Sequence, residues 1–211
     1  MPSVPRRTLF IGLIALGLMT PSLAVPADTG SGASQFVGNL VNSALQVLAD
    51  RKAAAAAREQ TFERLLSENF DVPRIARFVL GRYWTTASDQ DRRKFIDTYR
   101  EFIIRTYAAR FSEYSGETVK VTSSRPEGAN YTVVNSEIIH PNGDPPVKVS
   151  WRVRQSGDSY KIVDVDVEGV SMMLTQREEF TSVIQRTGGT VGGLIQAIQQ
   201  KLQSGDLSLG G

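Results

Sequence analysis

Apolar side chains recur with the period of an α-helix through the first half of the chain, from about residue 35 to residue 113. Phe36 and Leu40, for example, fall on one side of a helical wheel. The alanine-rich segment KAAAAAREQ that follows has high helix propensity and little bulk, so we interpret it as a solvated helix that continues or joins its neighbours. A further stripe, which begins at Phe95, predicts a long helix over residues 88–113 with a capping box at its start.

The segment FDVPRIARFVLGRYW, residues 70–84, is more apolar than a helix with one buried face requires. Asp71 is suited to cap this helix, and the proline fits its first turn. One side of the helical wheel carries Ile75 and the valines, whereas Phe78 and Trp84 fall outside this stripe. The extra aromatic side chains indicate a second apolar surface, and the arginines are predicted to face solvent.

From residue 117 onward the period changes to two. The segments ETVKVTSS, NYTVVNSEII, PVKVSWRVRQ and YKIVDVDVEG are predicted to be strands, and turn-rich connections join them. In the third segment Val149, Trp151 and Val153 share one face, and serine and arginine side chains take the other. Short connections between consecutive strands predict an antiparallel sheet with one apolar and one solvated face.

Helical spacing returns after the strands, and this order predicts an α+β fold in which helices cover one face of a four-stranded antiparallel sheet. We expect a single domain over residues 35–204. The divisions predicted after residue 27 are a small-residue linker at 28–34, helices at 35–113, the sheet at 117–168, helices at 170–204 and a flexible tail at 205–211.

Residues 1–27 have the pattern of a secretory signal peptide. Arg6 and Arg7 precede an apolar run of about eleven residues, which is too short to span a bilayer core of about 30 Å. Ala24 and Ala27 both suit a cleavage site. The sequence therefore predicts export, and the paired arginines permit the twin-arginine route as well as the Sec route.

The net charge argues against nucleic acid as a partner. Removal of residues 1–27 takes Arg6 and Arg7 from the 24 basic residues and leaves 22 basic and 22 acidic ones, whereas nucleic-acid binding requires a basic excess on one face. The chain has no cysteine, so an exported form depends on a packed core rather than on disulfides.

No constellation of catalytic residues is apparent, and we predict no catalytic residue, no metal site and no cofactor. His140 is the only histidine and lies in the turn segment HPNGDPP. Asp164 and Asp166 share a face of a predicted strand, but they alternate with valines and are expected to face solvent. The protein is therefore not expected to be an enzyme.

The surplus of large apolar side chains has two explanations. Aromatic stripes at helical spacing usually fill a core. The same side chains can instead line a ligand cavity between sheet and helices, and the adjacent Met172 and Met173 suit such a place because thioethers adapt to variable shapes. The residues alone leave both open.

Three segments resemble the MlaC family of periplasmic phospholipid-binding proteins, which are also known as toluene-tolerance proteins. They are FDVPRIARFVLGRYW, YREFIIRTYAARFSEYSGE and VDVEGVSMMLTQREEFTSVIQRTGG. They occur in matching order, and the resemblance extends from about Phe36 to Leu202. It implies a curved sheet related to the nuclear-transport-factor-like (NTF2-like) and cystatin-like folds, with acyl chains inserted between sheet and helices and the headgroup in water.

The resemblance also implies a role in maintaining outer-membrane lipid asymmetry. A periplasmic, monomeric carrier would ferry phospholipid between an outer-membrane lipoprotein–porin complex and an inner-membrane ABC transporter, which it meets through an MCE-domain protein. The residues expected to bind lipid are Ile75, Val79, Leu80, Tyr83, Tyr99, Phe102, Ile103, Val149, Trp151, Val153, Val165, Val167, Met172, Met173 and Leu174. A charge among them, as in Val153→Arg, is expected to abolish lipid binding, and little selectivity for the headgroup is expected.

Three alternatives stay open at this point. The ligand can be a hopanoid or another envelope lipid, because a hopanoid-associated branch shares much of the pattern. The chain can be an enzyme similar to ketosteroid isomerase, which requires an acid inside the cavity. It can also be an adaptor without a ligand, which requires a filled interior.

Overall fold

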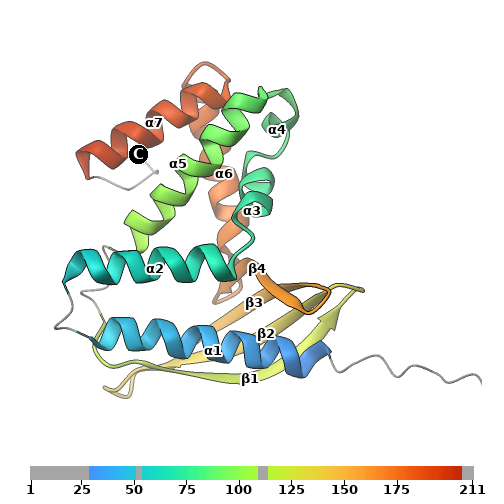
Figure 1. Ribbon diagram of the computed structural model, residues 1–211, viewed down its shortest axis with the longest axis vertical. Coiled ribbons are helices and arrows are strands. Elements are labelled where there is room, and N and C mark those ends of the chain that lie inside the picture. The colour runs from blue at the N-terminus through green and yellow to red at the C-terminus, as the bar shows by residue number, and fades with distance from the viewer. Residues whose placement is uncertain (1–28, 51–53, 109–113, 206–211) are drawn as a thin grey trace, which may run out of the picture.

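The computed structural model describes residues 29–50, 54–108 and 114–205. Helices come first, then strands, then two further helices, in the order that the sequence predicts (Figure 1). The elements are α1 Thr29–Ala49, α2 Ala55–Asn69, α3 Val72–Leu80, α4 Tyr83–Thr86, α5 Asp89–Ala108, β1 Thr118–Glu127, β2 Tyr131–Ile139, β3 Val147–Ser156, β4 Ser159–Val167, β5 Val170–Ser171, α6 Met172–Arg186 and α7 Val191–Ser204. None of the helices in these residues combines the length and hydrophobicity needed to cross a bilayer. The predicted signal peptide and residues 206–211 of the predicted tail lie outside the described residues.

The strands form an antiparallel meander in chain order, and this confirms the α+β prediction. The expected number of four strands is wrong by one, because the short β5 pairs with the end of β4. Glu168 and Gly169 connect the two strands with φ values of 52° and 85°, the left-handed conformation that a tight two-residue hairpin turn uses. A strand of two residues is too short to show a period in the sequence.

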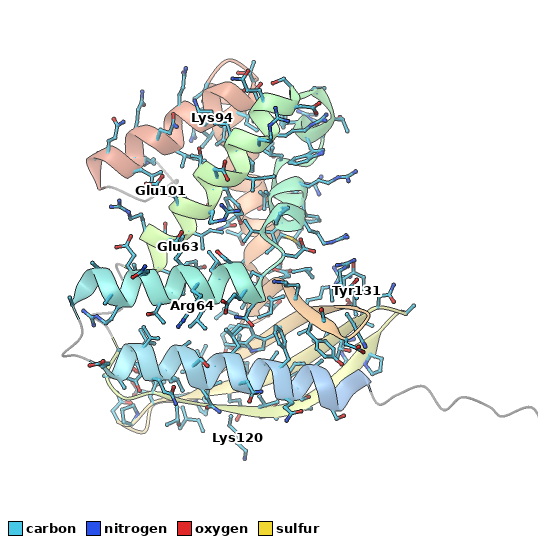
Figure 2. The ribbon with its side chains drawn as sticks, viewed as in Figure 1. Glu63, Arg64, Lys94, Glu101, Lys120 and Tyr131 are labelled. Carbon is cyan, nitrogen blue, oxygen red and sulfur yellow. The ribbon has the colours of Figure 1, made fainter. Side chains whose placement is uncertain are left out.

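One face of the sheet is covered by helices. Figure 1 shows α1 lying along the sheet, with α2 beside α1 and with α5, α6 and α7 forming a separate lobe. Figure 2 shows Lys120 of β1 pointing away from α1, on the uncovered face. The residues buried between α1 and the strands, called the sheet core below, are Ala33, Val37, Leu40, Val41, Val134, Val153 and Ile162.

The predicted linker at residues 28–34 is helical from Thr29 onward, so this expectation is wrong for the described part. Its small residues serve close packing instead. A Cβ added at Gly32 would lie 2.3 Å from the hydroxyl oxygen of Tyr160, and the Ser124 hydroxyl donates a hydrogen bond of 3.1 Å to the carbonyl oxygen of Gly30. Glycine therefore permits the start of α1 to lie directly on the sheet.

The helices of the separate lobe enclose a second apolar core. Phe180 of α6 is fully buried in it, and the rings of Phe95, Tyr99 and Phe102 surround it edge-on, with centroid distances of 5.8, 5.7 and 6.3 Å. The residues of this helical core are Leu66, Val72, Ile75, Ala76, Val79, Leu80, Phe95, Tyr99, Phe102, Ile103, Ile104, Met173, Phe180, Val183, Ile184, Val191, Leu194, Ile195 and Ile198.

Side-chain caps fix where several of these helices begin. Asp71, Ser88, Ser171 and Thr190 each accept a hydrogen bond from the backbone N–H three residues later. The caps predicted at Asp71 and at the start of the 88–113 helix are thereby confirmed. The long helix predicted over residues 88–113 is observed as α5, and residues 109–113 lie outside the described part of the chain.

Candidate functional site

A cavity of about 490 Å³ lies between the helical core and the sheet. Its walls come from α2, α3, α5 and the start of α6 on one side, and from β3 and β4 on the other. The lining residues are Phe62, Leu66, Phe70, Val72, Ile75, Tyr99, Ile103, Tyr107, Trp151, Val163, Asp164, Val165, Val167, Met172, Met173 and Gln176. Nearly all are aliphatic or aromatic, so the interior is suited to hydrocarbon.

Eight of the fifteen predicted lipid-binding residues line this cavity. They are Ile75, Tyr99, Ile103, Trp151, Val165, Val167, Met172 and Met173. The periodicity of each element explains how they meet. Tyr99, Ile103 and Tyr107 recur every four residues on one face of α5, and Val163, Val165 and Val167 alternate along β4.

Four of the other predicted residues belong to the helical lobe and do not line the cavity. Val79, Leu80 and Phe102 are part of the helical core, and Tyr83 packs against it. The axial position decides the difference on α3. Val79 lies four residues beyond Ile75, about 6 Å further along the helix axis. At that position the surroundings of α3 are core side chains and no longer the cavity.

The remaining three predicted residues also lie away from the cavity. Val153 is only 1% exposed, but it pairs with Ile162 beneath α1 and belongs to the sheet core. Val149 is buried and pairs with Val167, yet it is not among the lining residues. Leu174 is 52% exposed, because it points away from the core on the first turn of α6.

Half of the lining residues are not among the residues that the sequence predicts to bind lipid. Phe62, Leu66 and Phe70 follow one another every four residues along and just beyond α2, after the alanine-rich segment KAAAAAREQ that we interpret as a solvated helix. The four-residue spacing of these three residues predicts that they share one helix face, and it could have identified them as at least partly buried. The other lining residues that were missed are Val72, Tyr107, Val163, Asp164 and Gln176.

The expectation that Asp164 faces solvent is wrong, because this residue is one of the cavity-lining residues. Its carboxylate accepts hydrogen bonds from the backbone N–H of Val165 (2.8 Å), the hydroxyl of Ser171 (2.6 Å) and the backbone N–H of Met173 (3.1 Å). The short hairpin through β5 brings the start of α6 back over β4, and this return could not be predicted from strand alternation. Asp164 therefore ties the end of the sheet to the first turn of α6.

Tyr99 and Trp151, two further lining residues with polar atoms, are also hydrogen-bonded within the protein. The hydroxyl of Tyr99 donates a hydrogen bond to Oε1 of Gln176, and burial raises the pKa of this tyrosine above its usual range, so it stays neutral. The indole N–H of Trp151 donates to the hydroxyl of Ser136 at 2.9 Å. This bond satisfies the polar edge of the indole within the sheet.

No three His, Cys, Asp or Glu side chains gather into a possible metal site within residues 29–50, 54–108 and 114–205. His140 lies in the loop after β2, with Nδ1 3.7 Å from Oε1 of Glu117. Hydrogen bonds from Ser115, with a smaller contribution from His140, lower the pKa of Glu117 to about 2. Neither residue of this pair lines the cavity.

Comparison with known proteins gives a consistent family assignment. The family described as MlaC protein matches residues 38–200. A protein of Haemophilus influenzae named as the MlaC binding protein of an intermembrane phospholipid transport system is 29% identical over 125 residues, which span 58% of each chain and so less than two thirds of that relative. The toluene tolerance protein ttg2D of Pseudomonas putida is 22% identical over 214 residues, 99% of this chain and 97% of that protein.

A solved structure has the same fold. It is a phospholipid-binding protein of Ralstonia solanacearum in complex with a phospholipid, and it superimposes with a TM-score of 0.71 at 25% identity. The match covers 82% of this chain and 97% of the Ralstonia chain.

Proposed function

The chain belongs to the MlaC family, and from this premise we propose that it is a phospholipid-binding transport protein whose cavity holds an acyl chain of the lipid. The observation that carries the proposal is the apolar cavity itself, which lies between two well-packed cores instead of being filled by side chains. A relative of similar fold was solved with a phospholipid bound, which supports the same ligand class here.

The size of the cavity fits one hydrocarbon chain. A water-sized group takes about 30 Å³, so 490 Å³ holds roughly sixteen such groups, which corresponds to one common acyl chain. Each buried methylene contributes about 0.8 kcal/mol, and a chain of this size therefore gains roughly 13 kcal/mol before the costs of association. A lipid with two buried chains requires the cavity to widen, by movement of the helical lobe relative to the sheet.

The cavity offers few polar groups to a headgroup. Asp164 accepts three hydrogen bonds from the protein, and the hydroxyl of Tyr99 donates to Gln176. We therefore place the headgroup outside the apolar lining, in water, and expect affinity to depend on the acyl chain far more than on headgroup identity.

We also propose that the protein works in the periplasm as a carrier between the two membranes. The N-terminal signal pattern of residues 1–27 supports export. The name of the Haemophilus relative supports intermembrane phospholipid transport. The partners that the family resemblance implies, and that we propose here, are an ABC transporter with its MCE-domain protein at the inner membrane and a lipoprotein–porin complex at the outer membrane.

An enzymatic role is less well supported by the same cavity. A base of the ketosteroid-isomerase type needs a carboxylate free to accept a proton from the ligand. Asp164 is the one carboxylate among the described lining residues, and its oxygens are engaged by Val165, Ser171 and Met173. This carboxylate holds α6 in place, and we propose a binding protein rather than an enzyme.

The test is mass spectrometry of lipid extracted from protein that is purified without detergent from a Gram-negative host. We compare the wild type with Ile103→Trp, which fills the cavity, and with Ile139→Trp, which makes the same change at a partly exposed residue at the end of β2. Phospholipid is expected in the wild type and in Ile139→Trp, and its loss is expected in Ile103→Trp. Equal lipid in all three proteins would overturn the proposal, and a hopanoid in place of phospholipid would change the ligand class.

A further inference from the structure

A second hollow, of about 670 Å³, lies on the opposite side of α3 from the lipid cavity. It is an open groove among α3, α4, α5 and α6, and we call it the arginine groove. Its lining includes Arg74, Arg77, Arg177, Phe78 and Trp84. None of its lining residues also lines the lipid cavity, so the two sites are separate.

Arg177 is held in place across the floor of this groove. Its guanidinium lies over the ring of Phe78, 5.1 Å from the ring centroid. It also lies against Gly81, where an added Cβ would come within 2.9 Å of Nε, so glycine lets the guanidinium lie this close to the end of α3. Gly81 has a φ of 53°, which ends the helix at the same residue.

Trp84 is fixed at the other side of the groove by Arg92. The Nε of Arg92 donates to the carbonyl oxygen of Trp84 at 2.8 Å, and its Nη2 donates to the carbonyl oxygen of Thr85 at 3.2 Å. The same guanidinium lies 5.6 Å from the centroid of the Trp84 ring. The groove thus presents two positioned aromatic side chains, Phe78 and Trp84, which lose little freedom when a ligand packs on them.

The charge of the groove is unbalanced. Asp71 is its one lining carboxylate among the described residues, and it is already engaged by Arg74 at 3.2 Å and Arg154 at 3.6 Å. Within the part of the chain that the structure describes, no carboxylate lies within ion-pair distance of Arg77 or Arg177, and both are exposed. Two arginine forks are therefore free to receive carboxylates from outside.

We propose that the arginine groove docks an acidic segment of a partner protein. Carboxylates of the segment pair with Arg77 and Arg177, and an apolar side chain of the segment packs on Phe78 and Trp84. Arginine with aromatic residues is the composition of protein-interface hot spots. The groove is far larger than an inorganic anion requires, and its arginines line a recess instead of projecting as a convex surface that would meet a membrane.

The probe for this proposal is an array of octapeptides that combine Glu or Asp with Leu or Phe, and the matched array carries Gln or Asn at the acidic positions. Binding is measured on wild-type protein, on Arg77→Glu and Arg177→Glu, and on Arg125→Glu, which reverses an exposed arginine on β1. Each groove variant is expected to weaken binding of the acidic peptides by about tenfold or more, because a charge-assisted hydrogen bond is lost and a like charge is introduced. Arg125→Glu is expected to leave binding unchanged, and the neutral peptides are expected to bind weakly to all proteins.

Three outcomes would overturn the proposal: no acidic peptide binds the wild type, the groove variants bind as the wild type does, or the neutral peptides bind equally well. Binding of phosphatidylglycerol vesicles in place of peptides, lost in the same two variants, would instead assign the groove to a membrane. Thermal melting and copurified lipid serve as controls, and both are expected to stay unchanged because the arginines are exposed and lie outside the lipid cavity.

Discussion

Helix α5 contributes to both the helical core and the apolar cavity, yet the core is solid and the cavity is hollow. On α5, Phe95 and Phe102 pack against Phe180, whereas Ile103 and Tyr107 line the cavity. Tyr99 and Ile103 belong to both, because they are residues of the helical core that also line the cavity, and the ring of Tyr99 lies edge-on to Phe180. The difference is in the partner: α6 and α7 fill the space beside one end of α5, while the sheet stays apart from the other end.

Hydrophobicity alone does not distinguish a core from a binding site. Both regions bury aromatic and aliphatic side chains at helical spacing. The cavity is the region where the opposing layers stay apart, and Figure 1 shows α2 between α1, which lies on the sheet, and α5, which belongs to the helical lobe. Matched substitutions in the solid and hollow regions should therefore behave differently.

The largest difference is expected for valine-to-arginine substitutions in the sheet. Val153→Arg places a charge in the closed sheet core, and the uncompensated burial costs on the order of 5 kcal/mol, comparable to the stability of a whole domain. Val165→Arg places the same charge in the cavity, from which a long side chain can extend its guanidinium toward water. We expect the first protein to be insoluble, and the second to fold without lipid.

Soluble yield, circular dichroism and extracted lipid are measured for both valine variants. A folded, lipid-free Val153→Arg would place that residue in the cavity and contradict the comparison. The original expectation that Val153→Arg acts through lipid binding is thus replaced by one in which it acts through folding.

A smaller difference is expected for phenylalanine-to-alanine substitutions. Phe180→Ala empties the centre of the helical core and is expected to lower the free energy of unfolding by about 4 kcal/mol. Phe62→Ala removes a partly buried ring from the wall of an existing cavity, and about 1–2 kcal/mol is expected. Urea unfolding of lipid-free proteins measures both, and equal losses would show that the cavity wall is packed as tightly as the core.

The smallest effect is expected for Tyr99→Phe, at the boundary between the two regions. The ring that packs on Phe180 is retained, and only the hydrogen bond to Gln176 is lost, for about 1 kcal/mol. Lipid content is expected to stay at the wild-type level because the hydroxyl is not needed to bury methylenes. A loss of lipid in folded Tyr99→Phe would show that the Tyr99 hydroxyl forms a hydrogen bond with a polar group of the ligand.

The sequence predicted the elements better than it predicted the site. Periods of two and of three to four residues located the main strands and helices, because each buries one face. The hydrophobic pattern did not predict structure where a close approach between two elements, rather than the burial of apolar side chains, determines the fold. The small residues before residue 35 form the start of α1, since Gly32 lets that helix approach Tyr160, and no periodic pattern predicts this contact.

Membership of the cavity could be predicted only in part. Ile75 and Val79 have the same chemistry on the same stripe of α3, but they face different surroundings one turn apart. The alternation of Asp164 with valines predicts a solvated side chain, but the hairpin at Glu168 and Gly169 brings the start of α6 onto it. Spacing along one element specifies a face, but the arrangement of all the elements specifies what that face meets.

The most direct test is a nuclear Overhauser measurement between a protonated phospholipid and methyl-labelled protein in a deuterated background. The acyl-chain protons are expected to contact the methyl groups of Ile103 and Val165, which line the cavity, and not those of Val153 and Ile184, which lie in the two solid cores. Contacts at Val153 or Ile184, or no contact at Ile103 and Val165 in lipid-loaded protein, would contradict the claim that this cavity holds the lipid.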